Sequence, residues 1–235
     1  MLQKNPNFSG VTGPVVIIVM DGYGIPKTDV GSAIAAAKKP TLDRLFAQYP
    51  NITLRAHGTA VGMPSDDDMG NSEVGHNAIG AGQVYSQGAS LVSNAIASGA
   101  IWQGEAWQQI IAGAKAGRSV VHFIGLFSDG NVHSHIDHLK AMVQQAKLEG
   151  IKTVRIHALL DGRDVPETSA LDYVVPFEAF LIEISADGFD ARIASGGGRQ
   201  FITMDRYDAN WAMVDRGWKT HVLGEGQQFA NATAA

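Results

Sequence analysis

The stretch "VVHFIGLFSDG", residues 120–130, decides the fold because it is a short apolar run that ends in an Asp-Gly turn. A continuous run of β-branched and aromatic residues is typical of a strand buried on both faces of a parallel sheet. The same pattern occurs in "PVVIIVMDG" at 14–22 and in "KTVRIHALLDG" at 152–162. We therefore expect strands at all three places, each followed by a loop that begins with an aspartate.

Helix-like segments separate these runs. Helices are expected at 40–50, where a proline stands at each end, and at 72–82, 135–150 and 171–184. Gly150 is the expected C-cap of the third helix, and Pro176 limits where the last helix starts. Further strands are expected at "NITLRAHG" (51–58) and "ARIAS" (191–195), the second followed by a "GGGR" loop. Strands that alternate with helices predict an α/β fold with parallel sheets and helices on their faces.

Composition narrows the function classes. The chain has 235 residues, enough for one large domain or two small ones, and its net charge of -5 gives no general attraction for nucleic acid or an anionic membrane. It has no cysteine, which excludes disulfides and thiolate metal sites. We see no signal peptide or membrane-length apolar run, so we expect a cytoplasmic protein.

Charged residues gather where the predicted strands end, which is where open parallel sheets bind ligands. In "DGRD" (161–164), Arg163 suits a carboxylate or phosphate and Asp164 can accept from a hydroxyl, although a surface salt bridge is the simpler interpretation. Arg199 and Arg206 follow three glycines that permit close approach to a ligand. His133, His135 and His138 are spaced too loosely for one helix face to present all three to a metal, and one of them, just after the strand at 120–127, more plausibly donates to an oxyanion.

The serine in "DDDMGNSEVGH" (66–76) has two interpretations. Ser72 can be the N-cap of a helix, or it can be a nucleophile that a metal ion activates in place of a histidine base. Asp21 is likewise either a turn residue or a metal ligand. We assign no catalytic role to the aspartates at 66–68. We interpret His76 as structural, and His122 and His157 as core histidines.

With these pieces in place, the chain resembles the cofactor-independent (2,3-bisphosphoglycerate-independent) phosphoglycerate mutase family. The matching stretches run in family order along almost the whole chain: "VMDGYGI", "HGTAVGMPSDDDMGNSEVGHNAIGAG", "GLFSDGNVHSHIDHL", "HALLDGRDVPETSA" and "IASGGGRQFITMDRY". The resemblance implies a metal-binding phosphatase domain of alkaline-phosphatase type, interrupted by a substrate-binding transferase domain. Residues 1–84 then form the first segment of the former, and 85–235 form most of the latter.

The resemblance also implies a reaction. Family members interconvert 3-phosphoglycerate and 2-phosphoglycerate in glycolysis, with two divalent metals, commonly manganese, and without 2,3-bisphosphoglycerate. The residue matching Ser72 carries the phosphoryl group as a phosphoserine intermediate, and Asp21 and Ser72 ligate one metal. The substrate is held by His133, Arg163, Asp164, Arg199 and Arg206.

The chain matches only the amino-terminal half of the family, and the other metal ligands lie in the carboxyl-terminal half. Two oxygen ligands do not complete a site for a hard ion, which takes about six. We therefore expect an incomplete form, monomeric unless the missing half is its partner. The alternatives are a non-catalytic phosphoglycerate-binding fragment, half of a split enzyme, or a metal-dependent phosphatase of related fold.

Overall fold

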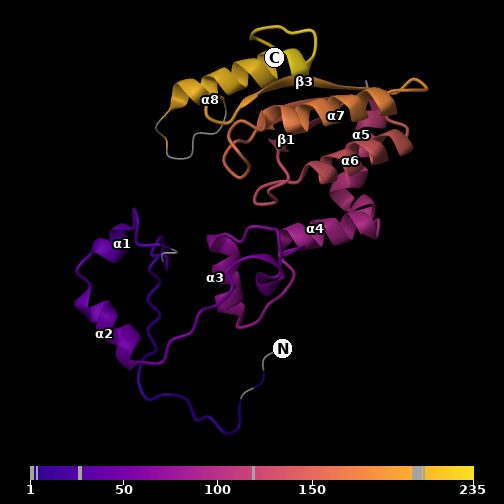
Figure 1. Ribbon diagram of the computed structural model, residues 1–235. Coiled ribbons are helices and arrows are strands. Elements are labelled where there is room, and N and C mark those ends of the chain that lie inside the picture. The colour runs from indigo at the N-terminus through magenta and orange to yellow at the C-terminus, as the bar shows by residue number, and fades with distance from the viewer. Residues whose placement is uncertain (1–2, 4, 26–27, 118–119, 203–207, 209) are drawn as a thin grey trace. The chain divides into compact units, whose positions relative to one another are not determined.

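The computed structural model describes residues 3, 5–25, 28–117, 120–202, 208 and 210–235 (Figure 1). The chain divides into two units, Met1–Leu54 and Arg55–Ala235. The boundary predicted at residue 84 from the family resemblance stays a prediction. None of the helices in the described part of the chain combines the length and apolar character needed to cross a bilayer.

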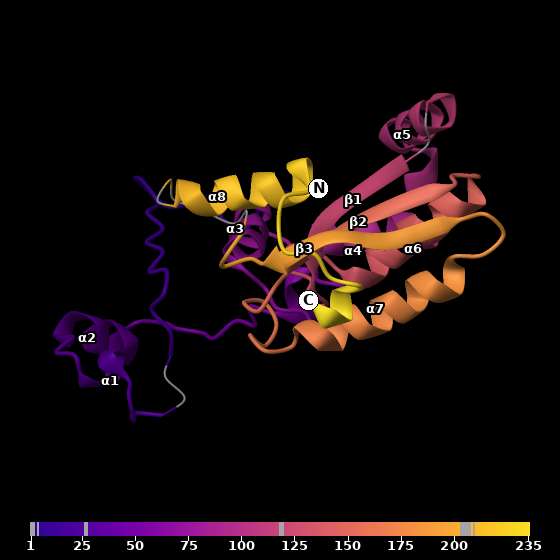
Figure 2. The same ribbon diagram turned by 90° about the horizontal axis from the view of Figure 1, so that it is seen from above.

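The second unit is built on a parallel sheet. Its strands are β1 (Val120–Phe127), β2 (Thr153–Leu160) and β3 (Asp190–Gly198), in the order β1-β2-β3 (Figure 2). The crossovers are α6 (Ile136–Leu148) and α7 (Ala170–Ile184). The strands at 120–127 and 153–160, and the α/β class, are confirmed. The register pairs Phe127 with Leu160 and Leu160 with Gly198, so the three strands end level with one another.

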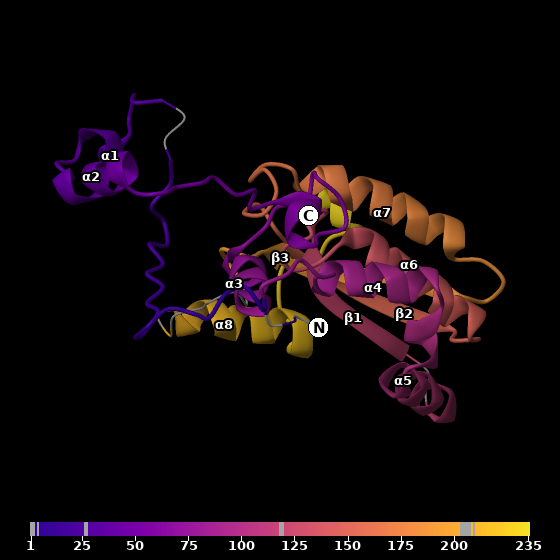
Figure 3. The same cartoon turned by 90° about the horizontal axis from the view of Figure 1, so that it is seen from below.

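The main core lies between the sheet and the two crossover helices, which cover the same face (Figure 3). Val143 of α6 and Phe177 of α7 are fully buried against Val154 and Ile156 of β2. Burying a side chain of this size contributes about 1.5–3 kcal/mol. Helix α5 (Glu105–Ala116) adds Trp107 and Ile111 to the same core. These helices therefore support the sheet whose strand ends carry the predicted site residues.

Four hydrogen-bonded side chains, which we call the polar chain, form a row on the other face of the sheet. On this face the π-helical turn η3 (Lys219–Leu223), which follows α8 (Trp211–Trp218), contacts β3. His122 Nδ1 lies 2.9 Å from His157 Nε2, His157 Nδ1 lies 2.6 Å from Ser195 Oγ, and Ser195 Oγ lies 2.7 Å from His221 Nδ1. His157 is half-buried and hydrogen-bonded, whereas His122 is exposed. Our interpretation of His122 as a core residue was wrong, because it projects from the face that α6 and α7 leave uncovered.

A second, small core precedes the sheet. It joins η1 (Gly58–Val61), α3 (Ser72–Ala81) and α4 (Gly88–Ala97) through Val61, Met63 and Val74, with Ala89 packed against them. Gly62 has a φ of 84°, and a Cβ there would meet the Tyr85 carbonyl oxygen, which only glycine avoids. The turn η2 (Ala100–Gln103) then leads into α5.

Two boundaries differ from the predicted ones. Strand β3 continues through Gly196, Gly197 and Gly198, so these glycines form no loop and Arg199 follows the sheet directly. Glycine suits position 197 because the Ile202 side chain packs close to its backbone. A Cβ at Gly197 would lie 2.4 Å from Ile202 Cδ1, where the chain turns back. Helix α7 begins at Ala170 and contains Pro176 in its interior, so the proline does not set its start.

The carboxyl-terminal residues return to α7. The short helical turn η4 (Ala232–Ala234) is held by Glu178, whose Oε1 accepts from the Ala232 N–H at 2.8 Å. Its Oε2 accepts from the N–H and hydroxyl of Thr233 at 3.0 and 2.5 Å. A carboxylate at the start of a helical turn satisfies N–H groups that would otherwise lack a partner.

The first unit contains α1 (Ala33–Ala36) and α2 (Pro40–Gln48), the second as predicted. The strand predicted at 14–20 is wrong: no strand forms among the described residues of this unit, and the side chains from Val15 to Met20 are 47–81% exposed. The strand predicted at 51–58 is also absent. A strand needs a neighbour for its N–H and C=O groups, and these segments have none among the described residues. Asp21 therefore does not sit at a strand end.

Candidate functional site

The predicted cluster of charged residues forms at the carboxyl ends of the sheet. Because Phe127, Leu160 and Gly198 are paired in register, the next residues of the three strands, Ser128, Asp161 and Arg199, come to the same edge. A hollow of about 500 Å³ opens here, and its lining includes Asp161, Arg163 and Arg199. This placement agrees with the sequence-based expectation that ligands gather at strand ends.

Asp161 organises this edge. Its side chain is buried, and its Oδ1 accepts from the backbone N–H groups of Arg163 and Asp164, both at 3.1 Å, and from Arg199 Nη1 at 2.7 Å. Burial raises the pKa of Asp161, but hydrogen bonds from Asp164, Ser128, Arg199 and Arg163 outweigh it and lower the pKa below its ordinary value. Asp161 is therefore an ionised carboxylate that fixes both the "DGRD" turn and the arginine.

Asp164 links His133 to Arg199. Its Oδ2 lies 2.5 Å from His133 Nδ1 and 3.6 Å from Arg199 Nη1. The side chains of Asp164 and Arg199 are 9% and 12% exposed, whereas that of His133 is 52% exposed. The structure thus brings these three predicted residues together. Asp164 was expected to accept from a ligand hydroxyl, yet here its carboxylate contacts the His133 imidazole and the Arg199 guanidinium.

Arg199 and Arg163 differ in how far their guanidinium groups are already paired with carboxylates. Arg199 shares its charge with two carboxylates, and its Nη1 is the atom that contacts both. A guanidinium has five N–H donors, so its remaining nitrogens can still reach a ligand. Arg163 is exposed, and its side chain makes no ion pair with any residue that the structure describes. It is the stronger candidate for a free anion contact. Arg206 lies outside the described residues.

Ser72 is the first residue of α3 and is exposed. Its interpretation as the N-cap was wrong, because Asn71 caps the helix by accepting from the Val74 N–H at 3.0 Å. Asn71 precedes Ser72 and can adopt the extended backbone that a cap requires. The Ser72 hydroxyl is therefore not used to start the helix.

His76 does not act as a base for Ser72 in this arrangement. Its Nδ1 lies 2.7 Å from the Ser72 carbonyl oxygen and 3.2 Å from Ser72 Oγ. A carbonyl can only accept, so Nδ1 carries the proton and has no lone pair for the serine hydroxyl. This local geometry agrees with the interpretation of His76 as structural.

A hollow of about 250 Å³ lies between the start of α3 and the loop after β1. Asn71, Glu73 and Val74 line it from the side of Ser72, and Asn131, His133 and Ser134 line it from the side of the sheet. His133 therefore faces this hollow, while Arg163 and Arg199 line the larger one. The Asp164 carboxylate connects the two groups.

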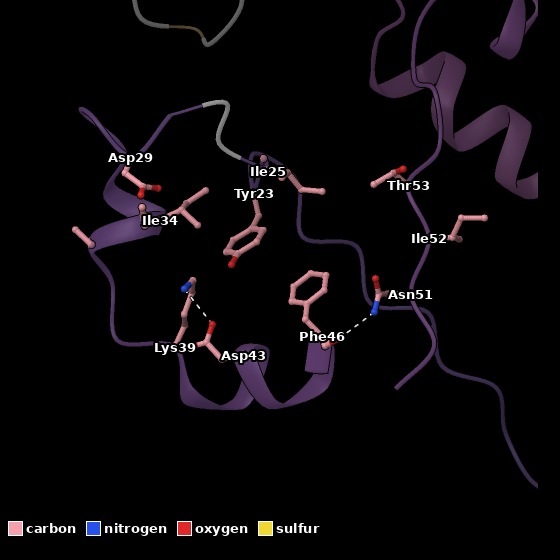
Figure 4. Close-up of a pocket in the computed structure, with 13 residues that line it drawn as sticks. Tyr23, Ile25, Asp29, Ile34, Lys39, Asp43, Phe46, Asn51, Ile52 and Thr53 are labelled. Atoms are coloured by element: carbon pink, nitrogen blue, oxygen red, sulfur yellow. Dashed lines mark hydrogen bonds and ion pairs between the residues drawn. The ribbon is translucent and has the colours of Figure 1, made fainter. Parts of the chain in front are cut away.

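A third hollow, of about 680 Å³, belongs to the first unit alone (Figure 4). Figure 4 shows the Tyr23 side chain between those of Lys39 and Phe46. Lys39 donates to Asp43 at 3.0 Å, and Asn51 donates to the Phe46 carbonyl at 3.0 Å. Asp21 is exposed and does not line this hollow. None of the described residues predicted to bind substrate or metal contributes to it.

The donors present do not make a metal site by themselves. Among the described residues, no group of three or more histidine, aspartate or glutamate side chains is arranged to hold an ion. Asp21 and Ser72 supply two oxygens against the about six that a hard divalent ion takes. Their shared metal stays a prediction.

Sequence reasoning missed two residues. Asp161 was noted only as part of a turn, although its place directly after a strand is the signal that could have singled it out. Asn131 was not singled out. Its side chain donates to Asp68 Oδ1 at 2.8 Å, a contact that no local pattern reveals because 63 residues separate the partners.

Comparisons with known proteins agree with these observations. Residues 92–235 match the protein family described as "BPG-independent PGAM N-terminus". A probable 2,3-bisphosphoglycerate-independent phosphoglycerate mutase of Leptospira interrogans is 59% identical over 223 residues, which cover 94% of this chain and 41% of that relative. The 2,3-bisphosphoglycerate-independent phosphoglycerate mutase of Trypanosoma brucei brucei is 47% identical over 222 residues, with 94% and 40% covered.

The fold agrees as well. A Leishmania mexicana phosphoglycerate mutase, solved at low cobalt concentration, superposes with a TM-score of 0.82 and 49% identity. The match covers 92% of this chain and 39% of that one. The chain thus spans about 40% of the length of these relatives.

Proposed function

Because the chain belongs to the family of 2,3-bisphosphoglycerate-independent phosphoglycerate mutases, we propose that it provides the nucleophile and the substrate-binding lobe for the interconversion of 3-phosphoglycerate and 2-phosphoglycerate. The observation that carries this proposal is the cluster at the strand ends, where Asp164 makes a hydrogen bond with His133 and an ion pair with Arg199. Arg163 and Arg199 line one hollow, which suits a small ligand with two anionic groups.

Ser72 is the proposed acceptor of the phosphoryl group. The bond between phosphorus and a glycerate oxygen breaks as the bond from phosphorus to Ser72 Oγ forms. The serine proton leaves, and the glycerate oxygen takes up a proton. Transfer back to the other glycerate hydroxyl regenerates the serine. Such transfers depend mainly on positioning and charge neutralisation, which Arg163 and Arg199 supply on the substrate side.

Divalent metals, for which manganese is our prediction, would neutralise charge on the transferred group when bound. This chain offers Asp21 and Ser72 towards them, so it does not hold the ions unaided.

The position of the substrate cluster supports a second candidate, a phosphoglycerate-binding fragment or one half of a split enzyme. The substrate cluster lies within the matched region 92–235, so this chain carries those proposed substrate contacts itself. This candidate predicts affinity for 3-phosphoglycerate that is independent of manganese, without turnover.

Titration calorimetry with 3-phosphoglycerate, with and without manganese, tests both candidates. Arg163→Ala should weaken binding by about tenfold to a hundredfold, the range for one charge-assisted contact. The matched control is Arg192→Ala, an exposed arginine on β3 that pairs with Asp190 and lines neither strand-end hollow. Equal affinity in both variants would remove Arg163 from the site, and a chain that binds no 3-phosphoglycerate would sink the proposal.

Product analysis separates the enzymatic classes. A mutase forms 2-phosphoglycerate with little free phosphate, whereas a metal-dependent phosphatase releases phosphate. Manganese-dependent formation of 2-phosphoglycerate by the purified chain would favour the mutase over the binding fragment. Ser72→Ala should abolish that activity, and substantial residual turnover would exclude Ser72 as the nucleophile.

A further inference from the structure

Ser72 stands on a small core that is distinct from the core of the sheet. We call residues 58–97, which contain η1, α3 and α4, the serine segment. Its buried residues Val61, Met63 and Val74 pack among themselves and against Ala89. The main core contains none of them. The placement of Ser72 relative to the substrate residues therefore depends on the contacts that join the serine segment to the sheet.

Two side-chain hydrogen bonds make this connection in the described part of the chain. Ser93 Oγ lies 2.9 Å from His138 Nε2, at the packing of α4 against α6. Asn131 Nδ2 donates to Asp68 Oδ1 at 2.8 Å. The second contact is closer in sequence to the chemistry, because Asp68 lies four residues before Ser72 and Asn131 lies two residues before His133.

Both partners of the Asp68–Asn131 contact are held rigidly. Asp68 Oδ2 accepts from the Ser65 N–H at 2.7 Å and from the Ser65 hydroxyl at 2.8 Å. The Asp68 carbonyl accepts from the Gly58 N–H at 3.0 Å. Asn131 is 9% exposed and has a φ of 55°, in the left-handed region that asparagine tolerates better than most residues. A fixed acceptor thus meets a fixed donor.

The ionisation of Asp68 agrees with this role. Burial raises its pKa, but hydrogen bonds from Asn131 and Ser65 outweigh the burial and leave the pKa below its ordinary value. A carboxylate only accepts, and the amide Nδ2 only donates, so the contact has one orientation. Asn131 also lines the hollow that separates the start of α3 from His133.

We propose that Asp68 and Asn131 are positioning residues: their contact sets the separation between the Ser72 end of α3 and the His133 loop. This inference rests on the proposed function for its catalytic meaning. It extends our expectation for the aspartates at 66–68, since Asp68 takes no part in chemistry and acts through the residues it places. Asp66, by contrast, accepts from Thr59 within the serine segment.

The absence of cysteine from the sequence permits a direct test. Asn77→Cys on α3 and Glu183→Cys on α7 are exposed positions in the same unit, and spin labels there report the distance between the serine segment and the sheet. Pulsed electron paramagnetic resonance on the ligand-free full chain should give one narrow distance distribution. Asn131→Ala and Asp68→Ala should each broaden it or shift its mean.

Exchange of the two groups provides the decisive variant. Asp68→Asn alone places two amides face to face, and Asn131→Asp alone places two carboxylates face to face. The double variant D68N/N131D restores a donor opposite an acceptor and should recover the narrow distribution. The control is Asp67→Ala, an exposed neighbour, which should leave the distribution unchanged. Thermal unfolding of each variant identifies any that fail to fold.

The outcomes separate this inference from the proposed function. An unchanged distribution in Asn131→Ala, or no recovery in the double variant, overturns the positioning role and leaves Ser72 chemistry untouched. Failure of the unmodified chain to bind 3-phosphoglycerate removes the proposed function, while the distance result stands because it is measured without ligand.

Discussion

Arg199 donates to Asp161 from the end of one strand to the end of the next, with Nη1 2.7 Å from Oδ1 and both side chains almost wholly buried. The pair is the fixed part of the strand-end cluster. Asp161 also accepts from two backbone N–H groups of the "DGRD" turn, so the ion pair and the turn depend on the same carboxylate.

We expect Arg199→Ala to lower the free energy of unfolding by about 3–5 kcal/mol, because it leaves a buried carboxylate without its cation. Arg192→Ala, whose guanidinium is 74% exposed in its pair with Asp190, should change it by about 0–1 kcal/mol. Urea denaturation at neutral pH measures both. Equal effects of the two substitutions would contradict the assignment of Arg199 as a structural anchor. Loss of binding in Arg199→Ala must therefore be interpreted beside its stability.

The polar chain across the open face of the sheet predicts a pH dependence. Burial lowers the pKa of His157, helped by His122 and His221, and burial lowers the pKa of His221. The folded state then binds fewer protons than the unfolded state just below the ordinary pKa of 6.5, so stability rises with pH through that window. Stability should fall as pH decreases below about 6.5.

The variant H157Q/H221Q tests this directly. Its free energy of unfolding, measured by urea titration between pH 7.5 and 5.5, should vary less with pH than that of the unmodified chain. Above pH 7.5 the two curves should run parallel. A steeper dependence in the double variant would show that the two imidazoles are not the groups responsible.

The clamp between Glu178 and η4 gives a third prediction. Glu178→Gln replaces one carboxylate oxygen by an N–H group and removes the charge that faces the Ala232 and Thr233 N–H groups. The loss should be about 1–3 kcal/mol of local stability. Amide hydrogen exchange at 232–234 should accelerate accordingly. Glu183→Gln, an exposed glutamate on the same helix, is the control and should leave that exchange unchanged.

The first unit should be the first part of the chain to be cut by protease. Its described residues include none that is buried, and protection from cleavage depends on buried, hydrogen-bonded backbone. Limited trypsin digestion should cleave after exposed residues such as Lys38 and Arg44 before it cleaves within the sheet. Mass spectrometry of the early fragments measures this order. Early cleavage inside 120–198 would contradict it.

The sheet could be predicted from sequence because its strands carry their own signal. The runs at 120–127 and 153–160 are apolar on the face that meets α6 and α7, and each finds a parallel neighbour within this chain. The run at 14–20 has the same composition and no such neighbour among the described residues. Composition indicates that a segment is suited to burial, but it does not reveal whether a partner strand is present to bury it.

The candidate site, too, could be predicted only in part from the sequence. Residues that follow strands, such as Arg199 and Asp164, could be placed together because parallel strands end at one edge. The role of Asp161 could not be separated from ordinary Asp-Gly turn chemistry. The contact of Asp68 with Asn131 depends on how two cores pack, which local periodicity does not record.

Gly197 has no side chain, and this leaves room for a neighbouring side chain to pack close to the backbone just before Arg199. Ile202 folds back into the space that a Cβ at Gly197 would fill, and the Arg199 N–H donates to the Leu160 carbonyl at 3.0 Å beside it. A methyl group here would displace the Ile202 side chain while every ionisable group stayed in the sequence. Anyone redesigning this pocket by exchanging its polar residues should therefore keep Gly197, because Ile202 occupies the space beside it.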